Sequence, residues 1–237
     1  SDERTRLELL GHLASGLAHE LGQPLSAARV GVEGLHYLRQ LGREPSPDHL
    51  VRTLSRVGLN LMAMTQTIEH LRHLARDDQR LGPLTVIELG AAVSTLLAER
   101  EQWLRYADTR IEWSCPDRPV FALADAASVR LILTNLLRNA VEAVASQSEA
   151  RRLVRVSVGP VPLVAVHDSC AGIGPEFLIH LFDPFHSTKG AGRGIGLSLA
   201  KASADRLGAH LEVASTLGSG TIFSLSLLSP SEQTSQS

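Results

Sequence analysis

The chain has 237 residues, of which 43% are hydrophobic and 20% are charged, and its formal net charge is -2 at pH 7. This composition is typical of a folded protein with two ordinary domains or one large one. The near-neutral charge argues against a nucleic-acid or anionic-lipid partner, since both require a basic surface. The only two cysteines, Cys115 and Cys170, fit neither a metal site nor a disulfide framework, which favours a reducing compartment. No apolar run reaches the roughly 20 residues that cross a bilayer.

Residues 2–41 predict one long helix, because apolar side chains recur every three or four positions. This apolar seam consists of Leu7, Leu10, Ala14, Leu17, Leu21 and Ala28. His19 lies off the seam, on the face expected to meet water, where a neutral imidazole can act as a nucleophile. Glu20 is its neighbour, and Gln23 follows one turn later on the same face. Pro24 cannot donate to the carbonyl of Glu20, so we expect a bend there.

A second helix is predicted after a turn at residues 42–48. Its heptad seam consists of Leu54, Val57, Leu61, Met64, Ile68, Leu71 and Ala75. Two long helices with a short connection form an antiparallel hairpin. A single hairpin leaves much of its seam in water, so we expect two hairpins to pair as a homodimeric four-helix bundle. The alternative is that the seam packs on the second domain.

A polar segment at residues 77–80, followed by Gly82-Pro83, predicts a domain boundary. The expected domains are residues 1–80 and 81–229, with a Ser/Gln-rich, disordered tail at 230–237. The chain starts inside charged, helix-forming sequence, so we expect further sequence upstream in the parent protein. Strands are predicted at residues 84–86, 109–114, 120–122, 153–158, 161–167, 209–214 and 221–228, and helices at 88–102, 125–146 and 196–207. This mixture indicates an α+β fold in which helices cover one face of a mixed sheet.

Two amides interrupt the apolar face of the predicted helix at residues 125–146. Asn135 and Asn139 are four residues apart and therefore share a face. An amide oxygen is a suitable ligand for Mg²⁺, which also takes water and phosphate oxygens, and Arg138 could meet a phosphate. The alternative is a helix with ordinary polar surface residues.

Asp168 ends a predicted apolar strand and is followed by Gly172 and Gly174. A carboxylate held at this point can accept a hydrogen bond from the exocyclic amine of adenine. The glycines allow the backbone to approach a ring closely. The alternative is a strand end closed by an Asx-turn.

A glycine-rich segment precedes the predicted helix at residues 196–207. Gly192, Gly194 and Gly196 expose backbone N–H groups beside the helix N-terminus, which is a suitable arrangement for phosphate. No apolar strand immediately precedes the segment, although a dinucleotide-binding fingerprint requires one. The segment also does not end in the Gly-Lys-Ser/Thr sequence of a P-loop. Nearby side chains add positive charge or could anchor a lid over a nucleotide, and they are Lys189, Arg193, Phe182 and Phe185. The two phenylalanines could equally be core residues.

Taken together, these stretches resemble the five sequence boxes of bacterial sensor histidine kinases. The boxes are the H-box at residues 19–25, the N-box at 135–143, the G1 box at 168–174, the F-box at 182–189 and the G2 box at 192–197. The resemblance covers the chain except its tail. It implies a dimerisation and histidine-phosphotransfer bundle followed by an ATP-binding sandwich of the GHKL type. Gln23-Pro24 resembles the branch that includes oxygen, redox and dicarboxylate sensors.

The resemblance also implies a chemistry. His19 would take the γ-phosphoryl group of ATP and pass it to an aspartate of a response-regulator receiver domain, with Glu20 holding the imidazole. Gln23 would orient water for regulator dephosphorylation, and Mg²⁺ would lie on Asn139 with Asn135. The implied nucleotide-binding residues are Asn135, Arg138, Asn139, Asp168, Gly172, Gly174, Phe182, Phe185, Thr188, Lys189, Gly192, Arg193, Gly194, Ile195, Gly196, Leu197 and Thr221. The expected location is the cytoplasm, with any membrane attachment through upstream sequence.

Two positions depart from the family pattern. Gly22 stands where this branch often has asparagine, and Cys170 replaces the first glycine of the G1 box. A cysteine would be strained there if the backbone required a positive φ. Three other interpretations stay open: a clamp ATPase that releases free phosphate, a scaffold with a degenerate site, and a redox sensor based on Cys170.

Overall fold

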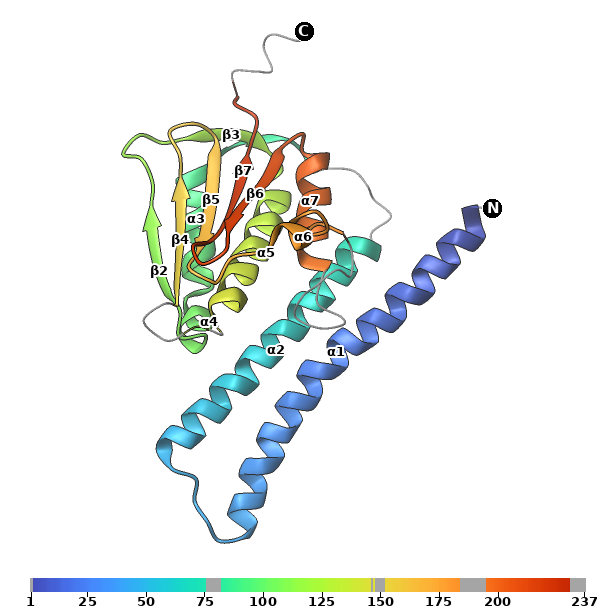
Figure 1. Ribbon diagram of the computed structural model, residues 1–237, viewed down its shortest axis with the longest axis vertical. Helices are drawn as coiled ribbons and strands as arrows, with labels where there is room; N and C mark the ends of the chain where they lie inside the picture. Colours follow the sequence, from blue (N-terminus) through green and yellow to red (C-terminus); the bar gives the residue numbers. More distant parts are fainter. Residues whose placement is uncertain (1, 76–81, 146, 148–151, 184–194, 231–237) are drawn as a thin grey trace. The chain divides into compact units, whose positions relative to one another are not determined.

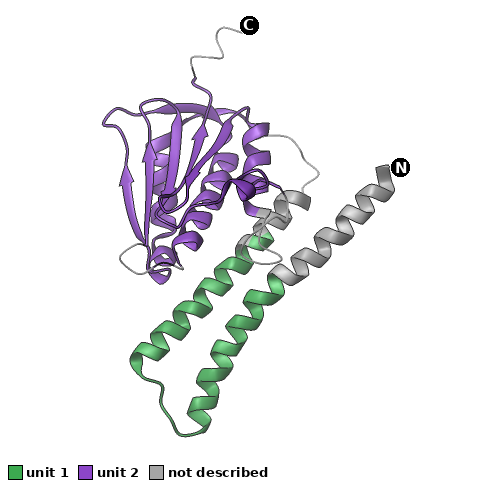
Figure 2. Ribbon diagram, in the orientation of Figure 1, with its two compact units in different colours: residues 1–77, 189–193 green, residues 78–188, 194–237 purple. Residues whose placement is uncertain are grey.

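The computed structural model describes residues 2–75, 82–145, 147, 152–183 and 195–230. The chain forms two compact units, coloured separately in Figure 2. The first contains a helical hairpin, and the second contains all of the described strands. The predicted boundary at residue 80 and residues 231–237 of the predicted tail lie outside the described residues.

Two long helices form the hairpin, α1 from Asp2–Gln40 and α2 from Pro47–Ala75. Helix α1 ends where Gly42 takes a φ of +68°, and the N–H of Arg43 returns to the carbonyl of Leu38 at 3.0 Å. The predicted bend at Pro24 does not end the helix, which runs through it (Figure 1). Proline removes only one hydrogen bond of the ladder, and the neighbouring turns keep theirs. No helix in the described part of the chain is long and apolar enough for a bilayer crossing.

Small residues are buried along the hairpin, and Gly31 of α1 lies against α2. Ala28 is buried, as are Thr53 and Thr67, and a Cβ added at Gly31 would lie 3.3 Å from Val57 Cγ2. The predicted α2 seam is therefore divided between two faces. Val57 packs against α1, whereas a stripe with a seven-residue spacing is left exposed, consisting of Leu54 at 54%, Leu61 at 51% and Ile68 at 42%.

The second unit is built on a five-stranded mixed sheet in the order β2-β4-β5-β7-β6. Strands β2 and β4 are parallel, and the other neighbours are antiparallel. The strands are β2 (Arg110–Ser114), β4 (Leu153–Val158), β5 (Leu163–Asp168), β6 (His210–Thr216) and β7 (Gly220–Ser226). Strands β1 (Thr85–Glu88) and β3 (Phe121–Ala124) form a separate antiparallel pair.

Helices cover one face of this sheet (Figure 1). They are α3 (Leu89–Glu99), α4 (Glu101–Tyr106), α5 (Ala126–Val144) and α7 (Ile195–Arg206), and a short α6 (Pro175–Leu178) follows β5. Strand residues alternate, so that Val154, Val166 and Phe223 are buried on the helix side. The predicted α+β fold with a mixed sheet and helices on one face is confirmed.

Local differences from the predicted elements have physical causes. The helix predicted at residues 88–102 is divided at Arg100 into α3 and α4, and Glu88 lies outside it as the N-cap. The Glu88 carboxylate accepts the N–H groups of Gly90 and Ala91, at 2.8 and 2.6 Å. Asp125 is the N-cap of α5, as predicted. Helix α6 was not predicted, because four residues carry too little periodicity.

Candidate active site

Three polar side chains form a row across neighbouring strands at one end of the sheet. Asp168, the last residue of β5, is the register partner of Thr221 on β7, and Thr221 is the register partner of Ser215 on β6. Asp168 and Thr221 are each only 1% exposed. A buried polar row at a strand end is expensive unless its groups are hydrogen-bonded, so it marks this end of the sheet as a candidate site.

The Asp168 carboxylate is incompletely satisfied. Its Oδ1 accepts the backbone N–H of Cys170 at 3.1 Å. Apart from the weak S–H donor of Cys170, the described residues offer it no other donor. A buried carboxylate needs more donors than this, and a ligand with an N–H group would supply one.

Two glycine turns pack backbone to backbone beside this carboxylate. Gly172 has a φ of +77°, and a Cβ added to it would lie 2.2 Å from the carbonyl oxygen of Thr216. Gly220 has a φ of +103°, and its added Cβ would lie 2.1 Å from the carbonyl oxygen of Asp168. The N–H of Gly218 donates to the carbonyl of Ala171 at 2.7 Å. The turn after β5 is therefore held against the β6–β7 turn at a distance that only glycine permits.

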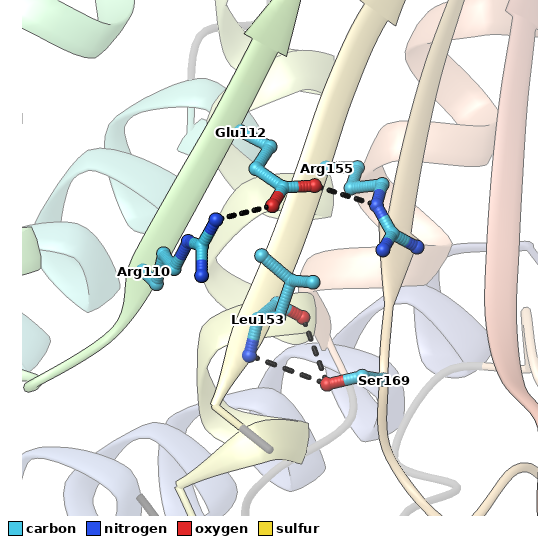
Figure 3. Close-up of polar contacts among 5 residues, drawn as sticks. All are labelled: Arg110, Glu112, Leu153, Arg155 and Ser169. Atoms are coloured by element: carbon cyan, nitrogen blue, oxygen red, sulfur yellow. Dashed lines mark hydrogen bonds and ion pairs between the residues drawn. The ribbon is translucent and has the colours of Figure 1, made fainter. Parts of the chain in front are cut away.

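Ser169 fixes the strand end that carries Asp168, as Figure 3 shows. Its hydroxyl accepts the N–H of Leu153 at 3.2 Å and donates to the Leu153 carbonyl at 3.0 Å. On the exposed face of the sheet, Glu112 of β2 bridges Arg110 and Arg155 at 2.8 and 2.7 Å. The hydrogen bond from Arg155 lowers the pKa of the Glu112 carboxyl despite some opposing desolvation. These contacts tie β2, β4 and the end of β5 together.

Cys170 occupies an unstrained position. Among the described residues, Asp108 is the only non-glycine with a positive φ, so the strain considered for Cys170 is absent. Burial, and then a hydrogen bond with Asp168, raises the pKa of the thiol. The thiol therefore stays protonated at neutral pH, which makes it a poor nucleophile and disfavours a redox role.

Helix α5 carries the predicted amides and packs against β5. Asn135 is buried, and its Nδ2 donates to the Leu131 carbonyl at 2.9 Å, whereas Asn139 is only half-buried. Arg138 pairs with Glu142 through its Nε at 2.7 Å. Asn139 is thus the more accessible of the two amides, and Arg138 would have to share its guanidinium between Glu142 and a phosphate.

Several predicted site residues fall beyond what the structure describes. These are Phe185, Thr188, Lys189, Gly192, Arg193 and Gly194, together with the side chains of His19, Glu20 and Ile195. Gln23 is exposed on α1, Gly174 is buried as the N-cap of α6, and Phe182 is half-buried. Gly196 and Leu197 lie half-buried in the first turn of α7. The structure therefore brings together Asp168, Gly172 and Thr221, and leaves the remaining assignments as predictions.

Sequence reasoning missed Ser215, Ser169 and Gly220. Ser215 and Gly220 could have been suspected, because an antiparallel hairpin around Gly218-Ser219-Gly220 places Ser215 opposite Thr221. Ser169 carried no signal, since its partner Leu153 lies on another strand.

The fit of the glycine turn predicts a stability difference between two alanine variants. Gly172 and Gly218 both have positive φ, but a Cβ at Gly218 meets nothing within 4 Å. Both variants should lose about 1–2 kcal/mol from left-handed strain, and Gly172→Ala should lose more because of its collision with Thr216. Urea unfolding followed by tryptophan fluorescence measures this, since Trp103 and Trp113 both lie in the second unit. Equal losses would mean that the turns are not packed as described.

Comparison with known proteins identifies the second unit. Residues 124–231 match the family described as histidine kinase-, DNA gyrase B-, and HSP90-like ATPase. The sensor protein FixL of Bradyrhizobium diazoefficiens is 29% identical over 94% of this chain and 44% of its own length. The C4-dicarboxylate transport sensor protein DctS of Rhodobacter capsulatus is 30% identical over 96% of this chain and 35% of its own. The chain spans less than half the length of both relatives.

Solved structures share the fold. The crystal structure of histidine kinase ThkA in complex with response regulator protein TrrA matches with a TM-score of 0.62 and 18% identity, covering 97% of this chain and 65% of that chain. The Acinetobacter baumannii histidine kinase AdeS matches with a TM-score of 0.56 and 20% identity, covering 90% and 98%. These identities are low, so the likeness concerns the fold.

The second unit is thus an ATPase domain of the class shared by histidine kinases, gyrase B and HSP90. Together with the hairpin that precedes it, this domain makes the chain similar, over 94% to 96% of its length, to sensor proteins of two-component systems. The resemblance predicted from the five boxes is confirmed.

Proposed function

We propose that this chain uses ATP to phosphorylate His19 and passes the phosphoryl group to an aspartate of a response-regulator receiver domain. The observation that carries the proposal is the buried, under-satisfied carboxylate of Asp168 beside a glycine turn, inside a domain of the ATPase family. The experiment that tests it is incubation with γ-labelled ATP followed by detection of labelled protein.

The adenine ring is proposed to bind at the end of the sheet. Asp168 offers a carboxylate acceptor for the exocyclic amine, and Thr221 offers a hydroxyl beside it. A Cβ added at Gly172 would meet the Thr216 carbonyl and one at Gly174 the Glu176 carboxylate, so these glycines serve close packing within the protein. Burying a carboxylate without hydrogen-bond donors costs free energy. An N–H group of the purine can offset that cost by donating to the carboxylate.

The phosphates and Mg²⁺ are assigned to the helical side of the domain. Asn139 offers a half-buried amide oxygen, and Asn135 lies one turn earlier. An amide oxygen is a suitable ligand for Mg²⁺, and the ion also binds phosphate oxygens. The described residues contain no cluster of three or more acidic, histidine or cysteine ligands, which fits a metal held largely by the substrate's own phosphates. When bound, Mg²⁺ would neutralise phosphate charge. Lys189, Arg193, Arg138 and the glycines at 192, 194 and 196 are proposed to hold the phosphate oxygens.

Phosphoryl transfer needs positioning and charge stabilisation more than covalent help from the protein. The lone pair of His19 Nε2 forms the new N–P bond, and the bond between the γ-phosphorus and the β–γ bridging oxygen breaks to release ADP. The proton on Nδ1 stays on the ring, which becomes cationic. The Glu20 carboxylate accepts a hydrogen bond from this N–H, which fixes the tautomer and stabilises the charge.

The exposed stripe on α2 supports a homodimer through the hairpin. Leu54, Leu61 and Ile68 present apolar surface at heptad spacing, as a helix does when it pairs with a second copy. The Leu61→Glu variant places two charges in the proposed interface and should weaken dimerisation by about 100-fold or more. The matched control is Val30→Glu, since Val30 is an exposed apolar residue of α1, at 64%, and does not belong to that stripe. Sedimentation equilibrium measures both, and an unchanged dimer in Leu61→Glu would contradict the interface.

Gln23 is proposed to orient water during dephosphorylation of the regulator. It is exposed on α1, one turn after His19, and an amide there can hold a water without reacting itself. The Gln23→Ala variant should keep autophosphorylation and lose most of the phosphatase rate, about 10-fold or more. Gln40→Ala, at the far end of the same helix, is the control. Regulator dephosphorylation and autophosphorylation are timed separately, and equal loss of both would indicate a structural role.

A further inference from the structure

Ser215 contacts three separate segments through one hydroxyl group. The backbone N–H of Ile173 donates to Ser215 Oγ at 2.8 Å. Ser215 Oγ lies 3.0 Å from the Gly220 carbonyl oxygen and 2.9 Å from Thr221 Oγ1. The hydroxyl thus joins the turn after β5 to the start of β7 at the candidate adenine site.

Counting hydrogens assigns a direction to these contacts. Ser215 has a single hydroxyl hydrogen, and the Gly220 carbonyl can only accept. If that hydrogen pointed at Thr221, two lone-pair oxygens would face each other at 3.0 Å across the Ser215–Gly220 contact. All three contacts are satisfied only when Ser215 donates to Gly220 and Thr221 donates to Ser215. The hydrogen of Thr221 is then engaged, and its remaining capacity is to accept.

The consequence concerns which base the site prefers. Thr221 is the register partner of Asp168, so two acceptors lie side by side at the end of the sheet. The Cys170 sulfur also lies 3.8 Å from Thr221 Oγ1, and its single weak S–H can serve only one of these two acceptors. A ligand amine satisfies both acceptors, directly or through one water, whereas a ring carbonyl at the same position would meet lone pairs from both.

We propose that Ser215 is a positioning residue that makes Thr221 an acceptor and thereby sharpens the preference for adenine over six-oxo purines. This inference rests on the proposed function of the site as an ATP site. Ser215 itself does not contact the nucleotide; it acts by orienting the Thr221 hydroxyl.

The test compares the dissociation constants of ATP and inosine triphosphate, which carries an oxygen in place of the amine, for the full chain by calorimetry. Ser215→Ala frees the Thr221 hydroxyl to donate. The dissociation constant of inosine triphosphate divided by that of ATP should therefore fall by about tenfold, which corresponds to one buried hydrogen bond. Ser215→Thr keeps a hydroxyl and should retain the ratio. Ser219→Ala, an exposed serine of the same turn, is the matched control.

A second variant keeps the proposal testable if Ser215→Ala folds poorly. Thr221→Val keeps the shape of the side chain without its hydroxyl, so it should lower the ratio by itself, and adding Ser215→Ala should then change the ratio no further. A fall in both affinities with an unchanged ratio would overturn the proposal, because loosening of the turn acts equally on both nucleotides. Absence of ATP binding by the unaltered chain would instead refute the proposed function.

Discussion

The Asp168→Asn variant is expected to lose ATP affinity by about 100-fold, because a charge-assisted hydrogen bond is lost and an amine then faces an amide donor. The fold should survive, since an asparagine Oδ1 can still accept the N–H of Cys170. Calorimetric titration with ATP and Mg²⁺ gives the affinity. Tryptophan fluorescence under urea gives the stability of the same preparation.

Two controls sharpen this result. Asp117→Asn removes an exposed carboxylate in the same domain and should leave ATP affinity within about twofold of the unaltered chain. Inosine triphosphate should lose less affinity than ATP in Asp168→Asn, because the new amide can donate to the ring oxygen. An unchanged ATP affinity in Asp168→Asn would remove this carboxylate from the nucleotide site.

The His19→Gln variant is expected to incorporate no labelled phosphate while binding ATP as tightly as the unaltered chain. Glutamine preserves a polar side chain of similar reach but has no nucleophilic nitrogen lone pair at neutral pH. His36→Gln is the matched control, since His36 is an exposed histidine on the same helix, where it contacts Gln40. Autoradiography of the separated protein measures incorporation, and calorimetry measures ATP binding. Retained labelling in His19→Gln would place the acceptor elsewhere.

Features carried by local pattern were predictable from the sequence. The hairpin followed from three- and four-residue periodicity, and the N-cap at Asp125 from its position before an apolar helix. Asp168 was identified because an apolar strand ends there and glycines follow. The residue of that turn with a positive φ is Gly172 and not Cys170. The close contact of Gly172 with the Thr216 backbone also excludes a side chain there.

Features that depend on pairing between distant segments were not predictable. The parallel pairing of β2 with β4 joins segments about 40 residues apart, and no turn between them sets the register. The contacts of Ser169 with Leu153 and of Ser215 with Ile173 likewise exist only once the sheet has formed. Along α2, periodicity identified the apolar positions. It could not show that Val57 packs on α1 whereas Leu61 stays exposed.

The most direct test of the proposed phosphotransfer is to incubate the chain with γ-labelled ATP and Mg²⁺ and examine the stability of the product. The expected product is labelled protein whose label is lost in acid and retained in base, as a phosphorus–nitrogen bond on histidine requires. Release of free phosphate with no labelled protein would contradict the proposal and would indicate a clamp ATPase on the same fold.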